Sequence, residues 1–427
     1  MDFIEHSLLS KRGKSEEKSN TDSKSNKKQH ISKWAVLALA SIPLVMTLGN
    51  SMLIPVLPVM EDTLNISSFQ SSMIITVYSI VAIVLIPIAG FLSDHIGRKK
   101  VIIPSLIITA VGGFISGWAA WKMKDPYMII LIGRALQGIG AAGAAPIVMP
   151  LVGDMFKSEE EVSSTLGIIE TSNTLGKVIS PILGAFLATF IWYIPFLAIP
   201  IFCLISILLM ALFVRRGKTE YEPIPFKEFI HQVKKIFKNN GRWLIAIFAI
   251  GIILMFVLFG VLFYLSETLE RHYDIVNVKK GLYLAIPLGA LCLTSLITGK
   301  VIKENQILMK WITFGGLFLL TLSIAALSFS KGLWFMLMMF LLAGIGIGAS
   351  LPCLDTLITE GVQKDQRGTI TSIYHSMRFV GVAAGPPIIA VLMKNFEASL
   401  FYILSVIGVL SVLLTLMAIR PDKKAAH

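Results

Sequence analysis

Runs of about 20 apolar residues recur along almost the whole chain, and this feature limits its possible folds more than any other. A helix of about 20 apolar residues crosses a hydrocarbon core about 30 Å thick. Hydrophobic residues make up 55% of the chain and charged residues 15%, which is typical of a membrane protein. The sequence therefore predicts an all-α membrane protein with twelve transmembrane helices. They are expected near 34–60, 70–92, 101–120, 127–152, 163–190, 192–214, 243–265, 279–299, 308–328, 333–357, 369–391 and 398–419.

Polar segments divide the chain into five parts. Residues 1–33 are rich in Lys, Ser, Glu and Asn, which predicts a disordered cytoplasmic tail, and the first apolar run is too long for a signal peptide. Two six-helix bundles are expected at 34–214 and 243–419, joined by the linker 215–242 and followed by a short tail at 420–427.

The linker carries its own helical pattern. Its apolar residues recur at helical spacing beside several lysines, which predicts an amphipathic helix on the anionic inner leaflet, with a plain linker role as the simpler interpretation. These apolar residues are Phe226, Phe229, Ile230, Val233 and Phe237.

Basic residues are distributed unevenly along the chain. Lys and Arg number 38 against 26 Asp and Glu, and most of them fall in loops and tails that share one side if the N-terminus is cytoplasmic. This asymmetry follows the positive-inside rule, so we expect a plasma-membrane protein with both termini in the cytoplasm. Nucleic-acid binding is not needed to explain the charge. Cys203, Cys292 and Cys353 lie inside apolar runs, so neither a disulfide nor a metal site is expected.

The two predicted bundles resemble each other in sequence. The segment from Gly138 to Pro146, GIGAAGAAP, aligns with GIGIGASLP from Gly344 to Pro352 at an offset of 206 residues. Gly176-Lys-Val-Ile-Ser-Pro aligns with Gly381-Val-Ala-Ala-Gly-Pro at an offset of 205. Two matches in order at nearly one offset indicate an internal duplication. Duplicated halves around a midplane site are a transporter design.

The loop between the second and third runs, GFLSDHIGRKK, concentrates glycine and charge between two apolar helices. Its pattern Gly90-x-x-x-Asp94-x-x-Gly97-Arg98-Lys99 resembles the signature loop of the major facilitator superfamily. The resemblance covers residues 34–419 and implies the same fold, with two pseudo-symmetric six-helix halves.

Two further elements resemble the drug/proton antiporter branch of this superfamily. One is Arg134-x-x-Gln137-Gly138 in the fourth run. The other lies in the fifth run, where the branch usually has Gly-x-x-x-Gly-Pro and this chain has Gly176-x-x-x-Ser180-Pro181. Both favour antiport over symport, and the residues from Gly176 to Pro181 are expected to take part in gating.

The loop is expected to act as a gate between the halves. Gly90 permits close helix approach, and Asp94 can sit at the positive N-terminus of a helix of the other half, most simply the eleventh. Arg98 can reach Asp154 at the end of the fourth run. These contacts could hold the cytoplasmic side closed. The alternative is a cluster of cations that only sets topology.

Charged residues inside the spans mark a candidate substrate and proton pathway, because such charges are costly in a membrane. Glu170, Asn173 and Lys177 share one helix face, and Tyr374, His375 and Arg378 share another. The offset of 205 relates Glu170 to His375 and Asn173 to Arg378. Arg134 is the remaining charge of the pathway. A closed set of salt bridges that only holds the helices together is the alternative.

Proton coupling is assigned first to Glu170, with His375 able to share the proton. Some members of the antiporter branch couple protons through an acid in the first span, but this chain has Asn50 in that region and Asp62 only at the rim. Asp355 is the next candidate acid. Asn50 and Asp355 complete the set of candidate residues for the pathway. Four residues could line an apolar pocket: Met46, Met52, Tyr78 and Phe256.

The sequence thus predicts a proton-coupled antiporter that exports drugs or other amphipathic compounds and functions as a monomer without a cofactor. Because cations outnumber acids in the pathway, export of an anionic metabolite, such as a catecholate siderophore or a lipid precursor, is a strong alternative. Uptake by symport and a membrane sensor are weaker ones. The chain has no Walker loop, His-Glu-x-x-His or Gly-x-Ser-x-Gly motif, so an enzyme is not expected. The expected partners are a small organic substrate, protons and membrane lipids.

Overall fold

The computed structural model describes residues 33–156, 158–214, 226–302, 305–330, 332–361 and 367–419. Most side chains of 226–240, and those of 159, 160, 360, 367 and 368, are not among the described ones. The two predicted tails and the first part of the predicted linker therefore lie outside the described residues, as do the apolar side chains of the linker helix.

Long helices account for all twelve predicted spans, and the described residues contain no strand. The first span is a broken helix made of α2, η1 and α3, and each other span is one helix. The elements are α2 (Lys33–Ser51), η1 (Ile54–Val56), α3 (Leu57–Leu64), α4 (Ser68–Ile96), α5 (Arg98–Lys122), α6 (Tyr127–Met155), α7 (Glu159–Ala188), α8 (Ile194–Phe213), α9 (Phe226–Arg271), α10 (Asn277–Ile302), α11 (Gln306–Ala326), α12 (Leu333–Glu360), α13 (Arg367–Asn395), η2 (Glu397–Ser399) and α14 (Leu400–Ala418).

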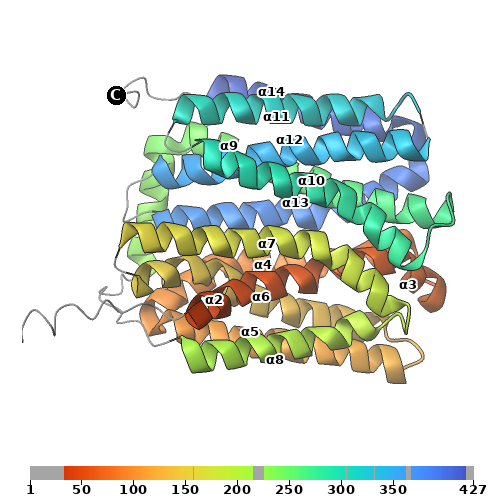
Figure 1. The fold of residues 1–427 in the computed structure, drawn as a ribbon, viewed down its shortest axis with the longest axis horizontal. Coiled ribbons are helices and arrows are strands. Elements are labelled where there is room, and N and C mark those ends of the chain that lie inside the picture. The colour runs from red at the N-terminus through yellow and green to blue at the C-terminus, as the bar shows by residue number, and fades with distance from the viewer. Residues whose placement is uncertain are drawn as a thin grey trace, which may run out of the picture.

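The helices form two halves that lie side by side. In Figure 1, α2–α8 make up the lower half and α9–α14 the upper half, with α7 and α4 facing α10 and α13 across the junction. The first helix begins and the last helix ends at the same end of the bundle, at the left of the view. The turn between α4 and α5 lies at that end too, whereas α3 lies at the opposite end, which we call the α3 end.

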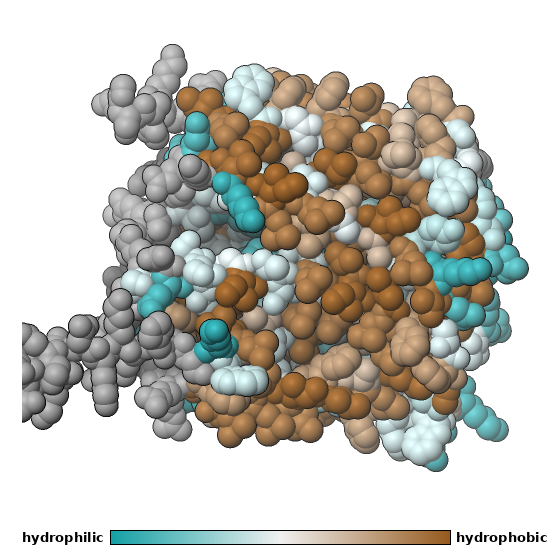
Figure 2. Space-filling view, viewed as in Figure 1, coloured by the Kyte–Doolittle hydropathy of each residue, from teal (hydrophilic) through white to brown (hydrophobic). Residues whose placement is uncertain are grey.

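Large apolar side chains are exposed on helices of both halves. Eleven helices of the described part are long and apolar enough to span a membrane. The twelfth, α7, is 30 residues long, and Glu170, Asn173 and Lys177 lower its hydropathy. Figure 2 shows hydrophobic residues over the middle of the visible face and hydrophilic residues toward its right-hand end. The predicted fold, a twelve-helix membrane protein with two related halves, is therefore confirmed.

The seventh span differs from the prediction at its start. The predicted linker helix and the span are one continuous helix, α9, of 46 residues. The part that can cross a membrane begins at Gly241. In Figure 1 the first part of α9, in light green, runs across the left end of the bundle, which is the end opposite α3.

Local signals in the sequence fix several helix ends. Ser67 and Gln70 form a capping box that starts α4, since each side chain bonds the backbone N–H of the other. Asn65 ends α3 with a left-handed backbone, φ 52°. Gly97 has φ 98° and separates α4 from α5, a conformation that side-chain-bearing residues rarely adopt.

Two hydrogen bonds tie α4 to α13 along the junction of the halves. Thr76 Oγ1 donates to Ala383 O at 2.7 Å, and Ser376 Oγ donates to Ile83 O at 2.6 Å. The α7–α10 junction is closed by backbone contact, because Gly281 lies directly against the carbonyl of Pro181. The halves thus meet along two seams, one formed by α4 with α13 and one by α7 with α10.

Glycines in α6 allow α5 to approach very closely. A methyl group at Gly140 would overlap Ser105 O and Thr109 of α5, whereas a methyl group at Gly153 in the same helix would meet no atom within 4 Å. Small residues at such contacts are what membrane helices use to pack.

We expect Gly140→Ala to destabilise the protein by about 1–3 kcal/mol, because the added methyl must displace the α5 backbone. Gly153→Ala is the matched control and should leave stability unchanged or slightly raised. Thermal unfolding of the two purified variants in detergent measures the difference. Equal melting temperatures would show that the α5–α6 contact can relax freely.

Candidate functional site

A cavity of about 150 Å³ lies between the two halves and is lined by six helices. α2, α4, α6 and α7 of one half and α9 and α13 of the other contribute to it. Its lining residues are Pro43, Met46, Thr47, Asn50, Ser51, Tyr78, Ala141, Ala145, Pro146, Met149, Ile169, Glu170, Asn173, Lys177, Met255, Phe259, His375, Arg378, Phe379 and Val382.

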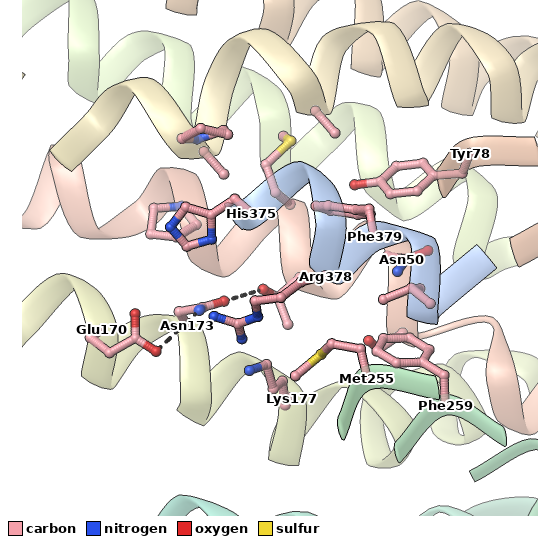
Figure 3. Close-up of a pocket in the computed structure, with 18 of the residues that line it drawn as sticks. Asn50, Tyr78, Glu170, Asn173, Lys177, Met255, Phe259, His375, Arg378 and Phe379 are labelled. Carbon is pink, nitrogen blue, oxygen red and sulfur yellow. Dashed lines mark hydrogen bonds between the residues drawn. The ribbon is translucent and has the colours of Figure 1, made fainter. Parts of the chain in front are cut away.

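The predicted polar face of the fifth span lines one side of this cavity. Glu170, Asn173 and Lys177 project from successive turns of α7 (Figure 3). Asn173 Nδ2 donates to Glu170 at 3.4 Å, and its Oδ1 accepts from Thr47 of α2 at 2.7 Å. The carboxylate of Glu170 thus has one weak hydrogen bond among the described residues and is open to other partners.

The predicted face of the eleventh span lines the other side. His375 and Arg378 of α13 both border the cavity, and the Arg378 side chain extends toward α7 (Figure 3). Its Nη1 lies 3.2 Å from Oδ1 of Asp355 on α12. Asp355 is outside the lining and balances the charge of Arg378. The residues related by the repeat, Glu170 with His375 and Asn173 with Arg378, therefore face one another across the cavity.

The ammonium group of Lys177 is the one cation lining the cavity that has no counterion among the described residues. No carboxylate of the described residues lies within ion-pair distance of its ammonium, and the side chain is only 9% exposed. Arg378 and Glu170 are both near enough to act on it electrostatically. With Arg378 matched by Asp355, one acid and one further cation remain in the cavity, and the cation faces its open space.

Arg134 lies behind the cavity wall and not in it. The residue is fully buried, and its guanidinium donates to Ile74 O at 2.7 Å, Gly49 O at 3.0 Å and Gln137 Oε1 at 2.6 Å. Asn50 Oδ1 accepts a fourth bond at 3.0 Å, and the guanidinium stacks on the ring of Tyr78 at 4.5 Å. Each of its three nitrogens donates to a protein oxygen. The structure therefore brings Asn50, but not Arg134, to the cavity surface.

Tyr374 also lies outside the lining. It is buried against Phe248, with ring centroids 5.9 Å apart, and beneath Arg378. Its position on α13 next to His375 made it a candidate for the pathway. The structure instead packs its ring against α9 and under the guanidinium of Arg378, so Tyr374 helps to position that side chain. Its hydroxyl has no hydrogen-bond partner in the described part of the chain.

Most of the apolar lining was not identified from the sequence. Of the four apolar candidates, Met46 and Tyr78 border the cavity, whereas Met52 and Phe256 do not. Phe379 contacts Tyr78 across the halves, with ring centroids 6.3 Å apart, and Phe259 and Met255 lie nearby (Figure 3). Phe379 follows Arg378 directly, yet nothing in an apolar helix distinguishes such a residue from one that faces lipid.

The loop from Gly90 to Lys100 forms an ion cluster at the end of the bundle opposite to α3. Arg98 pairs with Asp94 at 3.0 Å and also with Asp154 of α6. Gly90 lies against Ser372 of α13, since an added methyl would come within 3.4 Å of its hydroxyl. No contact of Asp94 with the first turn of α13 is present among the described residues, and 362–366 lie outside them.

The fifth-span motif packs against both neighbours of α7. Gly176 approaches Leu44 and Thr47 of α2, and Pro181 meets Gly281 of α10 in the other half. Ser180 replaces the usual glycine between them. It is fully buried and donates to Gly176 O at 2.6 Å, so its hydroxyl is satisfied within α7.

Comparison with known proteins decides the family. The model of the Major Facilitator Superfamily matches residues 39–386 and 310–427. The chain belongs to this superfamily. It is 54% identical over 389 residues to the bacillibactin exporter of Bacillus subtilis, a match that covers 91% of the chain and 97% of that protein. It is 25% identical to the multidrug efflux protein YfmO of the same organism, with 92% and 96% covered.

Solved structures show the same fold at low identity. The D-xylose-proton symporter matches with a TM-score of 0.74 and 14% identity, covering 92% of this chain and 98% of that one. The human organic anion transporter MFSD10 matches with a TM-score of 0.69 and 18% identity, covering 90% and 99%. The superfamily member described here is thus a multi-pass membrane transporter of small organic substrates.

We expect Asp94→Asn to leave membrane insertion and abundance intact and to remove most transport. Arg98 would keep Asp154 of α6 but lose its ion pair with Asp94, so the end of α4 would no longer be tied to α5 and α6 through this arginine. Transport by equal amounts of protein in vesicles measures the effect. Lys100→Gln is the control, because it removes a charge from the same loop without touching this cluster. Normal transport by Asp94→Asn would reduce the loop to a topology signal.

Proposed function

We propose that this transporter exports a catecholate siderophore of the bacillibactin type, in exchange for protons, across the plasma membrane. The observation that carries the proposal is the 54% identity to the bacillibactin exporter along nearly the full length of both chains. A match that covers 91% of this chain and 97% of that protein is an argument from the whole molecule and not from one motif. Of the two export functions expected from the sequence, this relative favours the anionic metabolite over drugs.

The charge of the cavity supports an anionic substrate. Lys177 faces open space without a counterion among the described residues, and Arg378 lies beside it with a single acid, Asp355. An anion that enters between α7 and α13 would meet both cations. Hydrogen bonds between charged partners are stronger than neutral ones, so these cations would contribute strongly to its binding.

The rest of the lining supports an aromatic substrate. Tyr78, Phe259 and Phe379 present rings to the cavity, and Met46, Met149 and Met255 add adaptable side chains. A substrate with aromatic rings and acidic groups would use both parts of this surface. The cavity of about 150 Å³ is smaller than the roughly 300–1,000 Å³ typical of drug-sized ligand sites, so loading requires the halves to move apart at one end.

Drug export is the second candidate. It is favoured by the apolar part of the lining and by the 25% identity to YfmO. The two functions differ in the sign of the substrate charge, because lipophilic cations would be repelled by Lys177 and Arg378 unless Glu170 and Asp355 both face them.

Proton exchange is assigned to Glu170. Its carboxylate is the acid of the cavity, and Lys177 and Arg378 both act on it electrostatically. A proton on Glu170 would remove a negative charge beside these cations, so substrate affinity should depend on pH through this residue. In this scheme the proton and the substrate bind in different conformations of the transport cycle. Both termini lie in the cytoplasm.

Transport in inside-out membrane vesicles tests the proposed function. Vesicles that contain the protein should accumulate iron-free bacillibactin when respiration acidifies their interior, and a protonophore should abolish the accumulation. Ethidium, a lipophilic cation, serves as the comparison substrate. Accumulation of ethidium but not of bacillibactin would favour drug export instead.

We expect Lys177→Gln to weaken bacillibactin binding by about tenfold or more, because a charge-assisted hydrogen bond contributes about 1.5–3 kcal/mol. Lys177→Arg keeps the charge and should retain most of the affinity. Binding to purified protein in detergent measures both variants. An equal loss of affinity for bacillibactin and for a neutral aromatic compound would show that Lys177 acts only in helix packing.

We expect Glu170→Gln to retain substrate binding, to flatten its pH dependence and to abolish uphill transport while sparing downhill exchange. The amide keeps the bond with Asn173 but cannot take up or release a proton. Proteoliposomes with imposed pH gradients separate the two transport modes. If Glu170→Gln still concentrates substrate at the wild-type rate, another acid couples the proton, and Asp355→Asn is the next variant to test.

A further inference from the structure

A second group of charged residues joins the two halves at the α3 end, remote from the loop of Gly90 to Lys100. Arg271 at the end of α9 crosses between the halves, since its Nη2 lies 2.9 Å from Glu61 and 3.4 Å from Asp62 of α3. Its Nε lies 3.0 Å from Glu267, one turn earlier in α9. The transport cavity contains none of these residues.

Two carboxyl groups of this group are buried and share one arginine. Glu61 is 4% exposed and Glu267 is 3% exposed, and both lie within ion-pair distance of the guanidinium of Arg271, so the charge of one acts on the other. Glu61 is well supplied with donors, because Ser71 donates to its Oε1 at 2.5 Å and Ser68 and Arg271 donate to its Oε2. Glu267 is not. Its Oε2 accepts from Arg271, but its Oε1 is buried without a hydrogen-bond partner among the described residues.

The positive charges near Glu61 and Glu267 are too few to neutralise both carboxylates. Glu270 pairs with the buried Lys280 of α10, so these two neutralise each other. Arg271 is then the cation shared by Glu61, Glu267 and Asp62. The Asp62 side chain is 66% exposed, so water can hydrate its carboxylate. Ser68 and Ser71, the side chains of α4 that bond Glu61, carry no charge, and the nearby His272 and Lys279 are exposed. One guanidinium therefore faces two buried carboxyls.

The repeat explains why two acids meet here. Glu61 and Glu267 are 206 residues apart, the same offset that aligns the glycine-rich segments of α6 and α12. They thus occupy equivalent positions in the first helix of each half. Equivalent residues near the axis that relates two halves lie next to each other. The repeat therefore places the carboxyl group of Glu61 close to that of Glu267.

We propose that the Glu61–Glu267 pair binds one proton when the α3 end is closed and releases it when the halves separate there. Two carboxyls at one site cannot both ionise without a large cost, and a proton on the unpartnered oxygen of Glu267 would satisfy both groups. The proposal rests on the proposed proton antiport and adds a proton-dependent closure at the α3 end, distinct from the proton exchange at Glu170. Because the closed form binds more protons than the open form, lower pH favours closure and higher pH favours opening.

Infrared spectroscopy of the purified full-length protein, without substrate, tests the proton site. In a Glu170→Gln background, which removes the cavity acid, we expect the C=O band of a protonated carboxyl group at neutral pH. This band should shift in heavy water and be lost in Glu267→Gln and in Glu61→Gln. Asp62→Asn is the matched control, because it changes an acid of the same cluster that is exposed, and it should retain the band. A band that persists in both Gln variants would overturn the proposal.

A distance measurement tests the link to closure. Spin labels on Thr63→Cys and Lys279→Cys, both exposed and in opposite halves, report the separation of the α3 end, while the native cysteines are buried. We expect the separated fraction to rise with pH in the otherwise wild-type protein and in Asp62→Asn. In Glu267→Gln the end should stay closed at every pH. Glu61→Gln should open further, because of the two Gln substitutions it is the one that removes a carboxylate bound to Arg271 across the halves.

A separation that does not depend on pH in the wild-type protein, or depends on it equally in both Gln variants, would overturn the proposal. Neither experiment uses a transported compound. Failure to export bacillibactin would therefore count against the proposed function and leave both results interpretable.

Discussion

Hydrocarbon offers no hydrogen-bond partner, so each ionisable side chain inside this bundle must find one within the protein or face water. Arg134 meets the first condition with four bonds to protein oxygens and a ring beneath its guanidinium. Lys177 meets the second, because it borders the cavity without an ion-pair partner in the described part of the chain. This difference decides which cation is structural and which is available to a substrate.

Periodicity alone was sufficient to predict much of the architecture and one part of the site. The apolar runs predicted all twelve spans, and helical spacing predicted that Glu170, Asn173 and Lys177 share a face. The internal repeat predicted that this face meets His375 and Arg378. Each of these predictions depends on residues within one helix or on a relation between two copies of it, which are properties that a sequence carries directly.

Partners that come from other helices could not be predicted in this way. Two of the four bonds of Arg134 go to backbone carbonyls, Ile74 O and Gly49 O, which no side-chain pattern reveals. Asp355 neutralises Arg378 from α12, a contact set by helix packing. Glu61 and Glu267 lie near the ends of apolar runs, where an acid is ordinary, so only their mutual approach distinguishes them. The continuous start of α9 was missed because its polar composition indicated a separate linker.

The two seams between the halves also govern how a substrate can reach the cavity. Thr76 and Ser376 bond across α4 and α13, and Gly281 brings α10 onto the carbonyl of Pro181 in α7. While these contacts hold, the paired helices stay together, so a compound is expected to enter where the halves separate at an end of the bundle. A compound dissolved in the bilayer would have to leave it before entering, whereas a water-soluble compound could diffuse straight to an open end. The route itself thus selects for solubility, before any side chain of the cavity makes contact.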